Sequence, residues 1–205
     1  GRLGGEGAES LIGWRLPRAG ESSLSARSCF TGETLIAVAD GDKPIKDIEI
    51  GDTVWSWDET TGKLALQPVV QLFERTVDEV VILRVGSETI RTTREHPFRV
   101  VGKGWVLVKD LIPGDALVTD GGDVLLIDGI EFRQGPFIVF NLEVANTHTY
   151  FITDRHILVH NMAMGTKPSE YATKRKLVSG PTYRLGSSDG GPGMWRRSPK
   201  YPRKQ

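Results

Sequence analysis

A seven-residue motif that occurs twice constrains the fold more than any other feature of the sequence. The copies at residues 46–52 (KDIEIGD) and 109–115 (KDLIPGD) share four identical residues and one Ile/Leu exchange, and they lie 63 positions apart. The shared Gly-Asp pair suits a tight turn, and such a turn alone could produce the match. Two copies are too few for a solenoid. Because each copy precedes a β-prone segment, we favour a duplicated half-domain folded about a pseudo-two-fold axis.

Short β-prone segments recur roughly every ten residues between Cys29 and Asn161. Turn-forming Gly and Asp residues separate them, and no apolar pattern of helical period runs long enough to compete. These segments predict strands at 34–39, 54–57, 80–85, 105–108, 124–127 and 137–144. The chain is therefore predicted to form an all-β domain, and no run approaches the roughly 18 apolar residues that span a membrane.

The net charge of zero hides a change of sign near residue 161. Residues 1–161 carry 16 Lys/Arg and 24 Asp/Glu, whereas residues 162–205 carry ten Lys/Arg and two Asp/Glu. Residues 1–28 are rich in Gly and Ser, and residues 162–205 are basic and rich in Pro and Gly, so we expect two flexible flanks around a folded domain at 29–161. The basic flank also carries Tyr and Trp and could bind nucleic acid, although such a segment is more often simply solvated.

The pair His160-Asn161 follows the last apolar segment and can cut its own backbone. The carboxamide nitrogen of Asn161 can attack its own main-chain carbonyl carbon, closing a succinimide and expelling Met162. A fold that fixes this geometry recovers much of the barrier, since oriented intramolecular reactions reach effective molarities of about 10⁵–10⁸ M. Imidazoles such as His160 and His148 can supply proton transfers worth about 10²–10⁴-fold. An Asn at the end of a strand is also, however, a common turn residue.

The single cysteine, Cys29, excludes an internal disulfide. A solitary cysteine is usually a small buried hydrophobe, but Cys29 stands where the strand-rich part of the chain begins. A hydroxyl and an imidazole lie three residues apart in Thr93-Arg-Glu-His96, directly before another β-prone segment. Cys29, Thr93 and His96 are therefore candidate reactive residues.

Taken in order, these motifs resemble those of a Hint domain, the self-processing module of inteins, bacterial intein-like proteins and the pretoxin processing domains of polymorphic toxins. The resemblance covers 133 of the 205 residues, from Cys29 to Asn161. It is carried by Cys29-Phe-Thr-Gly, Lys43-Pro-Ile-Lys-Asp-Ile with Gly51-Asp52, Thr93-Arg-Glu-His-Pro-Phe, Val108-Lys-Asp-Leu with Gly114-Asp115, Asn141-Leu-Glu-Val, Thr147-His-Thr-Tyr-Phe, and Leu158-Val-His-Asn161. The resemblance implies a horseshoe-shaped all-β fold built from two related halves, in agreement with the repeat.

The resemblance assigns the first reaction to Cys29. Its thiol would attack the carbonyl carbon of Ser28 and convert the Ser28–Cys29 peptide bond into a thioester by an N-to-S acyl shift. Because a free cysteine has a pKa of about 8.5 and the thiolate is the nucleophile, either this pKa is lowered or a base acts. His96 fits the acid that protonates the departing Cys29 nitrogen, and Thr93 would orient it or stabilise the oxyanion.

The resemblance assigns the second reaction to the other end of the domain. Asn161 would cyclise, with His148 activating its amide and His160 polarising its carbonyl or protonating the leaving amine of Met162. Asn141 falls where many inteins carry an aspartate, so the sequence departs from the family at that point. His156 matches no catalytic position and is expected to be a polar residue in a turn.

The residue after Asn161 favours cleavage over splicing. Splicing inteins need Cys, Ser or Thr there to receive the acyl group, and the thioether of Met162 cannot form that ester. We therefore expect single-turnover self-cleavage with at most a trace of spliced product. The domain would act as a monomer on its own flanking segments, with no cofactor, metal or small-molecule substrate.

Two other classes of function remain open at this stage. The first is a catalytically inactive β-rich binding module in which Cys29, His148, His156 and His160 hold a metal, if they converge in space. The second is a cysteine hydrolase that acts on other proteins through a Cys29–His96 dyad, which leaves the repeat and His160-Asn161 unexplained. A bacterial source and a secreted or cell-surface toxin precursor are expectations from the family resemblance alone.

Overall fold

The computed structural model describes residues 27–161, and within them the chain forms strands and short 3₁₀ helices but no α-helix. The strands are β1 (Phe30–Thr31), β2 (Leu35–Val38), β3 (Gly41–Pro44), β4 (Thr53–Asp58), β5 (Lys63–Val85), β6 (Glu88–Thr92), β7 (Pro97–Val100), β8 (Gly104–Leu107), β9 (Ala116–Val118), β10 (Val124–Val144), β11 (Thr149–Ile152) and β12 (Ile157–His160), and the 3₁₀ helices are η2 (Ile45–Asp47) and η3 (Val108–Asp110). The predicted all-β class is confirmed. The predicted flexible flanks, apart from residues 27 and 28, lie outside the described residues, and so does Met162.

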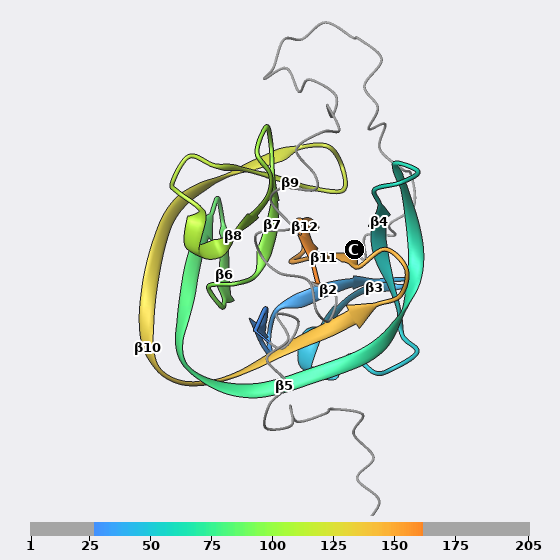
Figure 1. Ribbon diagram of the computed structural model, residues 1–205, viewed down its shortest axis with the longest axis horizontal. Helices are drawn as coiled ribbons and strands as arrows, with labels where there is room; N and C mark the ends of the chain where they lie inside the picture. The colour runs from blue at the N-terminus through green and yellow to red at the C-terminus, as the bar shows by residue number, and fades with distance from the viewer. Residues whose placement is uncertain (1–26, 162–205) are drawn as a thin grey trace, which may run out of the picture.

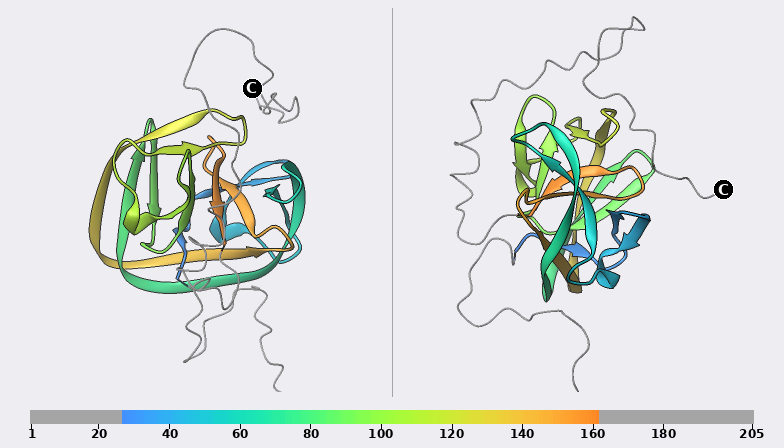
Figure 2. Two further views of the ribbon diagram at one scale, coloured as in Figure 1. Left: turned by 45° about the horizontal axis from the view of Figure 1, so that its top comes forward. Right: turned by 90° about the vertical axis from the view of Figure 1, so that its right-hand side faces the viewer.

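Two long antiparallel strands form the outer frame of the domain. β5 and β10 pair from Val85 and Ile127 at one end to Val69 and Val144 at the other. Figures 1 and 2 show this ribbon bending around the other strands, which gives the predicted horseshoe outline. The segments predicted as separate strands at 124–127 and 137–144 are therefore one strand. The register shifts between them are β-bulges, which bend a strand without ending it.

The hairpin of β11 and β12 lies inside the bend of this frame (Figures 1 and 2). All eight of its residues are buried. β12 pairs with β7 through Val159 and Phe98, and β11 pairs with β2 through Ile152 and Ile36. The hairpin is apolar on both faces because strands cover both of them. It therefore carries Asn161, the last residue that the structure describes, into the interior.

The two copies of the repeated motif fold in the same way. Each forms a 3₁₀ helix, η2 or η3, followed by a glycine with positive φ, Gly51 at 96° and Gly114 at 92°. The amide of Gly51 donates to the carbonyl of Val69 on β5, and the amide of Gly114 donates to the carbonyl of Ile127 on β10. The motif thus meets each long strand in an equivalent manner, as expected for two related halves.

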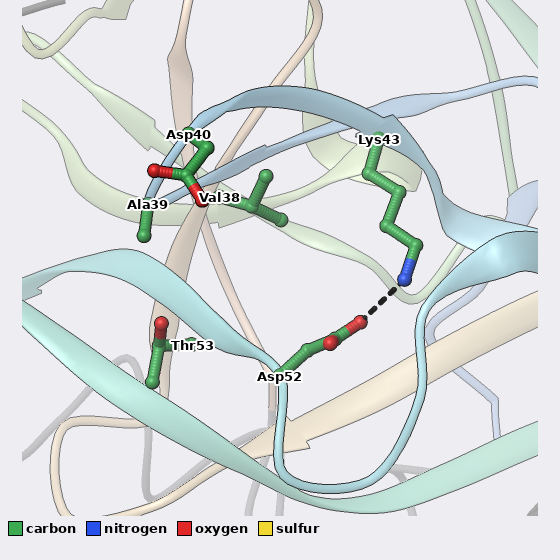
Figure 3. A pocket seen from close by; sticks show the side chains of 6 residues that line it. All are labelled: Val38, Ala39, Asp40, Lys43, Asp52 and Thr53. Carbon is green, nitrogen blue, oxygen red and sulfur yellow. Dashed lines mark hydrogen bonds and ion pairs between the residues drawn. The ribbon is translucent and has the colours of Figure 1, made fainter.

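An aspartate closes the turn in each copy. The carboxylates of Asp52 and Asp115 each accept the main-chain amide of the residue three positions earlier, at 2.9 and 3.2 Å. Each is also paired with a lysine, Asp52 with Lys43 and Asp115 with Lys103. Figure 3 shows the first pair beside a hollow between β2, β3 and β4. The Gly-Asp pair recurs because the turn needs a residue that tolerates positive φ and a side chain that caps it.

Candidate active site

The Ser28–Cys29 peptide bond lies in the interior of the domain. Both residues have no solvent-exposed surface. β1 holds them there, because Phe30 pairs with Thr92 on β6 and with Phe140 on β10. The hydroxyl of Ser28 donates to the carbonyl of Glu95 at 3.1 Å. The bond that the sequence analysis marks for the first reaction is therefore fixed between two strands and shielded from water.

The side chain of Thr93 hydrogen-bonds the main chain on both sides of Ser28. Its Oγ1 accepts the amide of Cys29 at 2.9 Å and donates to the carbonyl of Arg27 at 2.6 Å. Its own amide and the hydroxyl of Thr92 both donate to the carbonyl of Cys29, each at 3.0 Å. These four hydrogen bonds hold the Cys29 nitrogen, which would depart in an acyl shift, and the carbonyls of Arg27 and Cys29 on either side of it.

His96 lies fully buried beside this peptide, with its ring centroid 4.1 Å from that of Phe30. Burial holds the pKa of His96 well below its ordinary value, and the nearby His160 lowers it further, although the backbone of Ser28 opposes both. Neither ring nitrogen makes a hydrogen bond with any residue between 27 and 161. The ring is therefore a neutral imidazole near the backbone of Ser28, able to take up a proton and, once protonated, to release it readily.

The thiol of Cys29 is protonated at rest. Burial raises its pKa to about 11, and Glu95 adds to this effect, whereas Arg75 beside the thiol opposes it. The side chain packs with Val80 and Val139 in a small apolar cluster. Since the thiolate is the competent nucleophile, the thiol needs a base or a nearby positive charge in order to react near neutral pH.

Tyr150 and Asn141 form a buried hydrogen-bonded pair at the same site. The Tyr150 hydroxyl donates to Oδ1 of Asn141 at 3.0 Å, and neither residue is exposed. Burial raises the pKa of Tyr150 well above its ordinary value, and the proximity of Cys29 raises it further. The position at which many inteins carry an aspartate is thus occupied here by a neutral amide that a tyrosine satisfies.

Asn161 lies at the end of the inner hairpin with its side chain buried. Its main-chain amide donates to the carbonyl of His148 at 2.9 Å, which places the two residues opposite one another. Its carboxamide makes no hydrogen bond with the part of the chain that the structure describes. A buried polar group without a partner costs about 1–3 kcal/mol. His148 itself has a φ of 54°, a conformation that is uncommon outside glycine and that clusters at functional sites.

His160 is buried close to His148 and also influences His96. Its ring centroid is 6.3 Å from that of His148 and 5.1 Å from that of Trp105. Burial and the nearby His148 lower the pKa of His160 to about 3, while the backbone of Asn161 opposes them. His160 also lowers the pKa of His96. The two centres are therefore close enough to influence each other, and both imidazoles are neutral at pH 7.

His156 lies apart from these residues, in the turn between β11 and β12, as the sequence analysis expected. Its Nδ1 is 2.9 Å from the carboxylate of Asp120 and its Nε2 is 3.0 Å from that of Asp42. Within residues 27–161, no three His, Cys, Asp or Glu side chains are arranged to hold a metal ion. The four residues named for the metal-holding alternative are thus not gathered into one ligand set.

The structure brings the candidate residues predicted from the sequence together in two adjacent centres, and it adds two residues to which the sequence assigned no role. Cys29, Thr93 and His96 lie at the Ser28–Cys29 bond, and His148 and His160 lie near Asn161. The missed residues, Arg75 and Tyr150, lie beside Cys29. Arg75 stands in no local pattern that signals chemistry, because strand pairing brings it to the cysteine. Tyr150 lies in the Thr147-His-Thr-Tyr-Phe motif, but the motif alone assigned it no role.

The chain is similar to known self-processing domains. A family model described as the pretoxin Hint domain matches residues 35–162. A solved bacterial intein-like domain from Clostridium thermocellum is 34% identical, with 65% of this chain and 98% of that chain covered and a TM-score of 0.63. A solved DnaB intein from Synechocystis is 27% identical, with 66% and 99% covered and a TM-score of 0.57.

One curated protein matches part of the domain. The replicative DNA helicase DnaB of Rhodothermus marinus is 35% identical over 101 residues, which are 47% of this chain and 10% of the helicase. The chain therefore spans a small part of the helicase. That match extends the sequence similarity without bearing on helicase activity.

Proposed function

Because the chain belongs to the pretoxin Hint domain family, whose intein-like relatives process their own flanking segments, we propose that it cuts its own backbone at two bonds, Ser28–Cys29 and Asn161–Met162. The observation that carries the proposal is the Ser28–Cys29 peptide, buried and held by Thr93 beside a neutral His96. Each protein molecule performs each reaction once.

The first reaction is an N-to-S acyl shift. The Cys29 thiol gives its proton to the neutral ring of His96 while Sγ forms a bond to the carbonyl carbon of Ser28. The bond from that carbon to the Cys29 nitrogen then breaks, and the protonated ring returns the proton to this nitrogen. The low pKa of His96 suits this return, because an imidazolium held in an apolar site is a strong acid. Water then hydrolyses the thioester.

The second reaction is the cyclisation of Asn161. Its carboxamide nitrogen attacks its own carbonyl carbon, loses a proton toward His148, and expels the nitrogen of Met162, which gains a proton by way of His160. The buried carboxamide and the main-chain bond from Asn161 to His148 support this assignment. A near-attack geometry can replace much of the activation entropy that a free peptide must lose.

Cleavage is favoured over splicing because the acyl group has no acceptor. Met162 follows Asn161, and its thioether cannot take up an acyl group from the Cys29 thioester. Burial also argues against a cysteine hydrolase that acts on other proteins. Cys29 and His96 have no exposed surface, so a foreign peptide has no access to the pair without opening the domain.

The test is the intact mass of freshly expressed wild-type chain beside Cys29→Ala and Asn161→Ala variants, followed over hours with and without added thiol. We expect wild type to break after Ser28 and after Asn161, with added thiol accelerating the first cut. Cys29→Ala should lose only the first cut and Asn161→Ala only the second. A wild-type chain that stays intact under all these conditions contradicts the proposal.

A further inference from the structure

We propose that Arg75 is a further residue of the first reaction centre, where its guanidinium binds the carbonyl of Arg27 and stabilises negative charge on the sulfur of Cys29. The inference rests on the proposed acyl shift at Ser28–Cys29. It adds a fixed positive charge to a site whose other assigned groups, Thr93 and His96, are neutral.

Strand register places Arg75 on the face of the sheet that Cys29 occupies. Arg75 on β5 pairs with Val139 on β10, and Val139 pairs with Thr31 on β1. Residues in such a row point to the same face, and so do residues two positions apart on one strand. Thr31 and Cys29 are two positions apart, and Val139 packs against Cys29. Arg75 therefore reaches the cysteine across three neighbouring strands.

One nitrogen of Arg75 already binds the segment that would be cleaved. Its Nη2 donates to the carbonyl of Arg27 at 3.1 Å, and the hydroxyl of Thr93 donates to the same oxygen at 2.6 Å. One donor from β5 and one from the turn after β6 thus hold the peptide unit directly upstream of Ser28. This contact restricts the motion of the acyl group that the thiol must reach.

A second nitrogen of Arg75 has no acceptor at rest. Its Nε is buried and makes no hydrogen bond with any described residue. Such a donor costs free energy and requires an explanation. The guanidinium lies beside the Cys29 thiol and lowers its pKa by charge and by hydrogen bonding, against the larger effect of burial. Because the guanidinium already interacts with the thiol and has a further buried donor without an acceptor, it is placed to stabilise the thiolate once it forms.

Few other charged or titratable groups of the described chain act on this sulfur. Glu95, from the turn before β7, raises the pKa of Cys29, whereas Arg75 lowers it. Tyr150, on β11, has a pKa far above neutrality and stays protonated, and buried His96 is neutral. Arg75 is thus the group that favours negative charge on Cys29.

The chemistry of the step is unchanged by this assignment. The proton leaves the thiol for His96 and goes on to the Cys29 nitrogen, as one carbon–sulfur bond forms and one carbon–nitrogen bond breaks. Arg75 keeps all of its protons throughout. It contributes a positive charge while the sulfur carries negative charge, and it holds the Arg27 carbonyl in place.

The experiment uses the full chain with Asn161→Ala, which leaves the first reaction alone. Thiol-induced cleavage after Ser28 is followed across pH in three proteins: this parent chain, which keeps Arg75, and its Arg75→Met and Arg75→Lys variants. The concentration of reagent thiolate is held constant. We expect Arg75→Met to react about 10–100-fold more slowly, as for loss of a hydrogen bond to a charged group. Its rate should also begin to rise at a pH higher by about one unit. Arg75→Lys should recover most of the rate.

Two controls separate chemistry from folding. Arg84→Met removes another β5 arginine, one that is exposed and paired with Glu131 at 2.7 Å, and it should leave the rate unchanged. Arg75→Met in a Cys29→Ala chain should release residues 162–205 as fast as Cys29→Ala alone, which reports an intact fold. Failure of the parent chain to cleave after Ser28 overturns the proposed function. If the parent chain cleaves, either of two results overturns the role of Arg75. One is an Arg75→Met protein with the same rate and pH profile as the parent; the other is an Arg75→Lys protein that cleaves no faster than Arg75→Met.

Discussion

The turn at residues 31–34 in the first half of the domain and the turn at residues 93–96 in the second half are built by the same main-chain hydrogen bonds. The amide of Thr34 donates to the carbonyl of Thr31 at 3.0 Å, and the amide of His96 donates to the carbonyl of Thr93 at 3.3 Å. The carbonyls of Thr34 and His96 then accept the first amides of η2 and η3, at 2.8 and 3.0 Å. The two turns hold equivalent places in the two halves.

The side chains of these turns meet different surroundings. The hydroxyl of Thr31 donates to the nearby carboxylate of Glu33 at 2.8 Å, which is a local contact. The hydroxyl of Thr93 instead bonds the main chain of Arg27 and Cys29, more than sixty positions away in the sequence. The pairing of β1 with β6 brings the start of the domain alongside the second turn.

This difference shows that the two halves provide equivalent turns, whereas the path of the chain decides which turn contacts the Ser28–Cys29 peptide, where we propose the first reaction. Both turns present a threonine and, three residues later, a second buried polar residue. The main chain around Ser28–Cys29 is hydrogen-bonded by the threonine of the second turn, and there the second residue is an imidazole that can carry a proton. The reactive turn should therefore be sensitive to substitutions that its counterpart tolerates.

The largest contrast is expected between His96→Gln and Thr34→Ala. Glutamine can fill much of the ring's space but cannot carry the proton from sulfur to nitrogen, so His96→Gln should slow cleavage after Ser28 by about 10²–10⁴-fold. Thr34→Ala should change this rate by less than about twofold, because the turn is held by main-chain bonds. The measurement is the thiol-induced cleavage rate in the Asn161→Ala chain. Equal effects of the two substitutions would show that both turns matter only for folding.

A smaller contrast is expected between Thr93→Val and Thr31→Val. Valine keeps the shape of threonine but removes the hydroxyl that grips the Cys29 amide and the Arg27 carbonyl. Loss of these bonds should slow cleavage after Ser28 by about 10–100-fold, whereas Thr31→Val should have little effect on the rate. The same assay measures both, and a Thr93→Val chain that cleaves as fast as its counterpart would rule out the positioning role of Thr93.

The duplicated halves could be predicted because their turns are encoded locally. Each turn needs a glycine at positive φ and an aspartate that caps it, and both leave a short pattern that recurs in the sequence. The continuity of β10 could not be predicted in this way. Gly129 and Gly135 suggest turns when only neighbouring residues are considered. They lie instead within a strand that stays paired with β5 through its bulges.

The residues of the candidate site likewise fall into two groups, those that local sequence motifs indicate and those that only the fold brings together. Cys29, Thr93 and Asn161 stand in motifs whose order along the chain points to a family, so the sequence nominates them, and their catalytic roles stay predictions. Arg75 reaches the cysteine through pairing between strands that are distant in the sequence, and Tyr150 on β11 lies near it. No local pattern records such a register, so Arg75 could not be found before the fold was known, whereas Tyr150 stands in a sequence motif that assigned it no role.

The smallest effect is expected at the contact that ties the two halves together. His156 lies between Asp42, from the end of the first hairpin, and Asp120, from the turn after β9. Burial disfavours its charged form, but the hydrogen bonds and charges of Asp120 and Asp42 outweigh burial and raise its pKa. The stabilisation is therefore fully present below the unfolded-state pKa of about 6.5. It is lost as the pH rises through the higher folded-state pKa.

Replacement of His156 by Gln removes this charge and should reveal how far the halves hold together without it. At pH 6 we expect the free energy of unfolding to fall by about 1 kcal/mol, between the usual contribution of an exposed ion pair and that of a buried hydrogen bond to a charged group. Well above pH 7 the difference from wild type should shrink, because wild-type His156 is then neutral as well. Urea unfolding of Cys29→Ala/Asn161→Ala chains, which stay intact, measures both values. A difference in unfolding free energy that is constant with pH would mean that His156 contributes by packing alone. A difference confined to low pH would instead identify a charged contact that joins the two halves and takes no part in the chemistry of either cut.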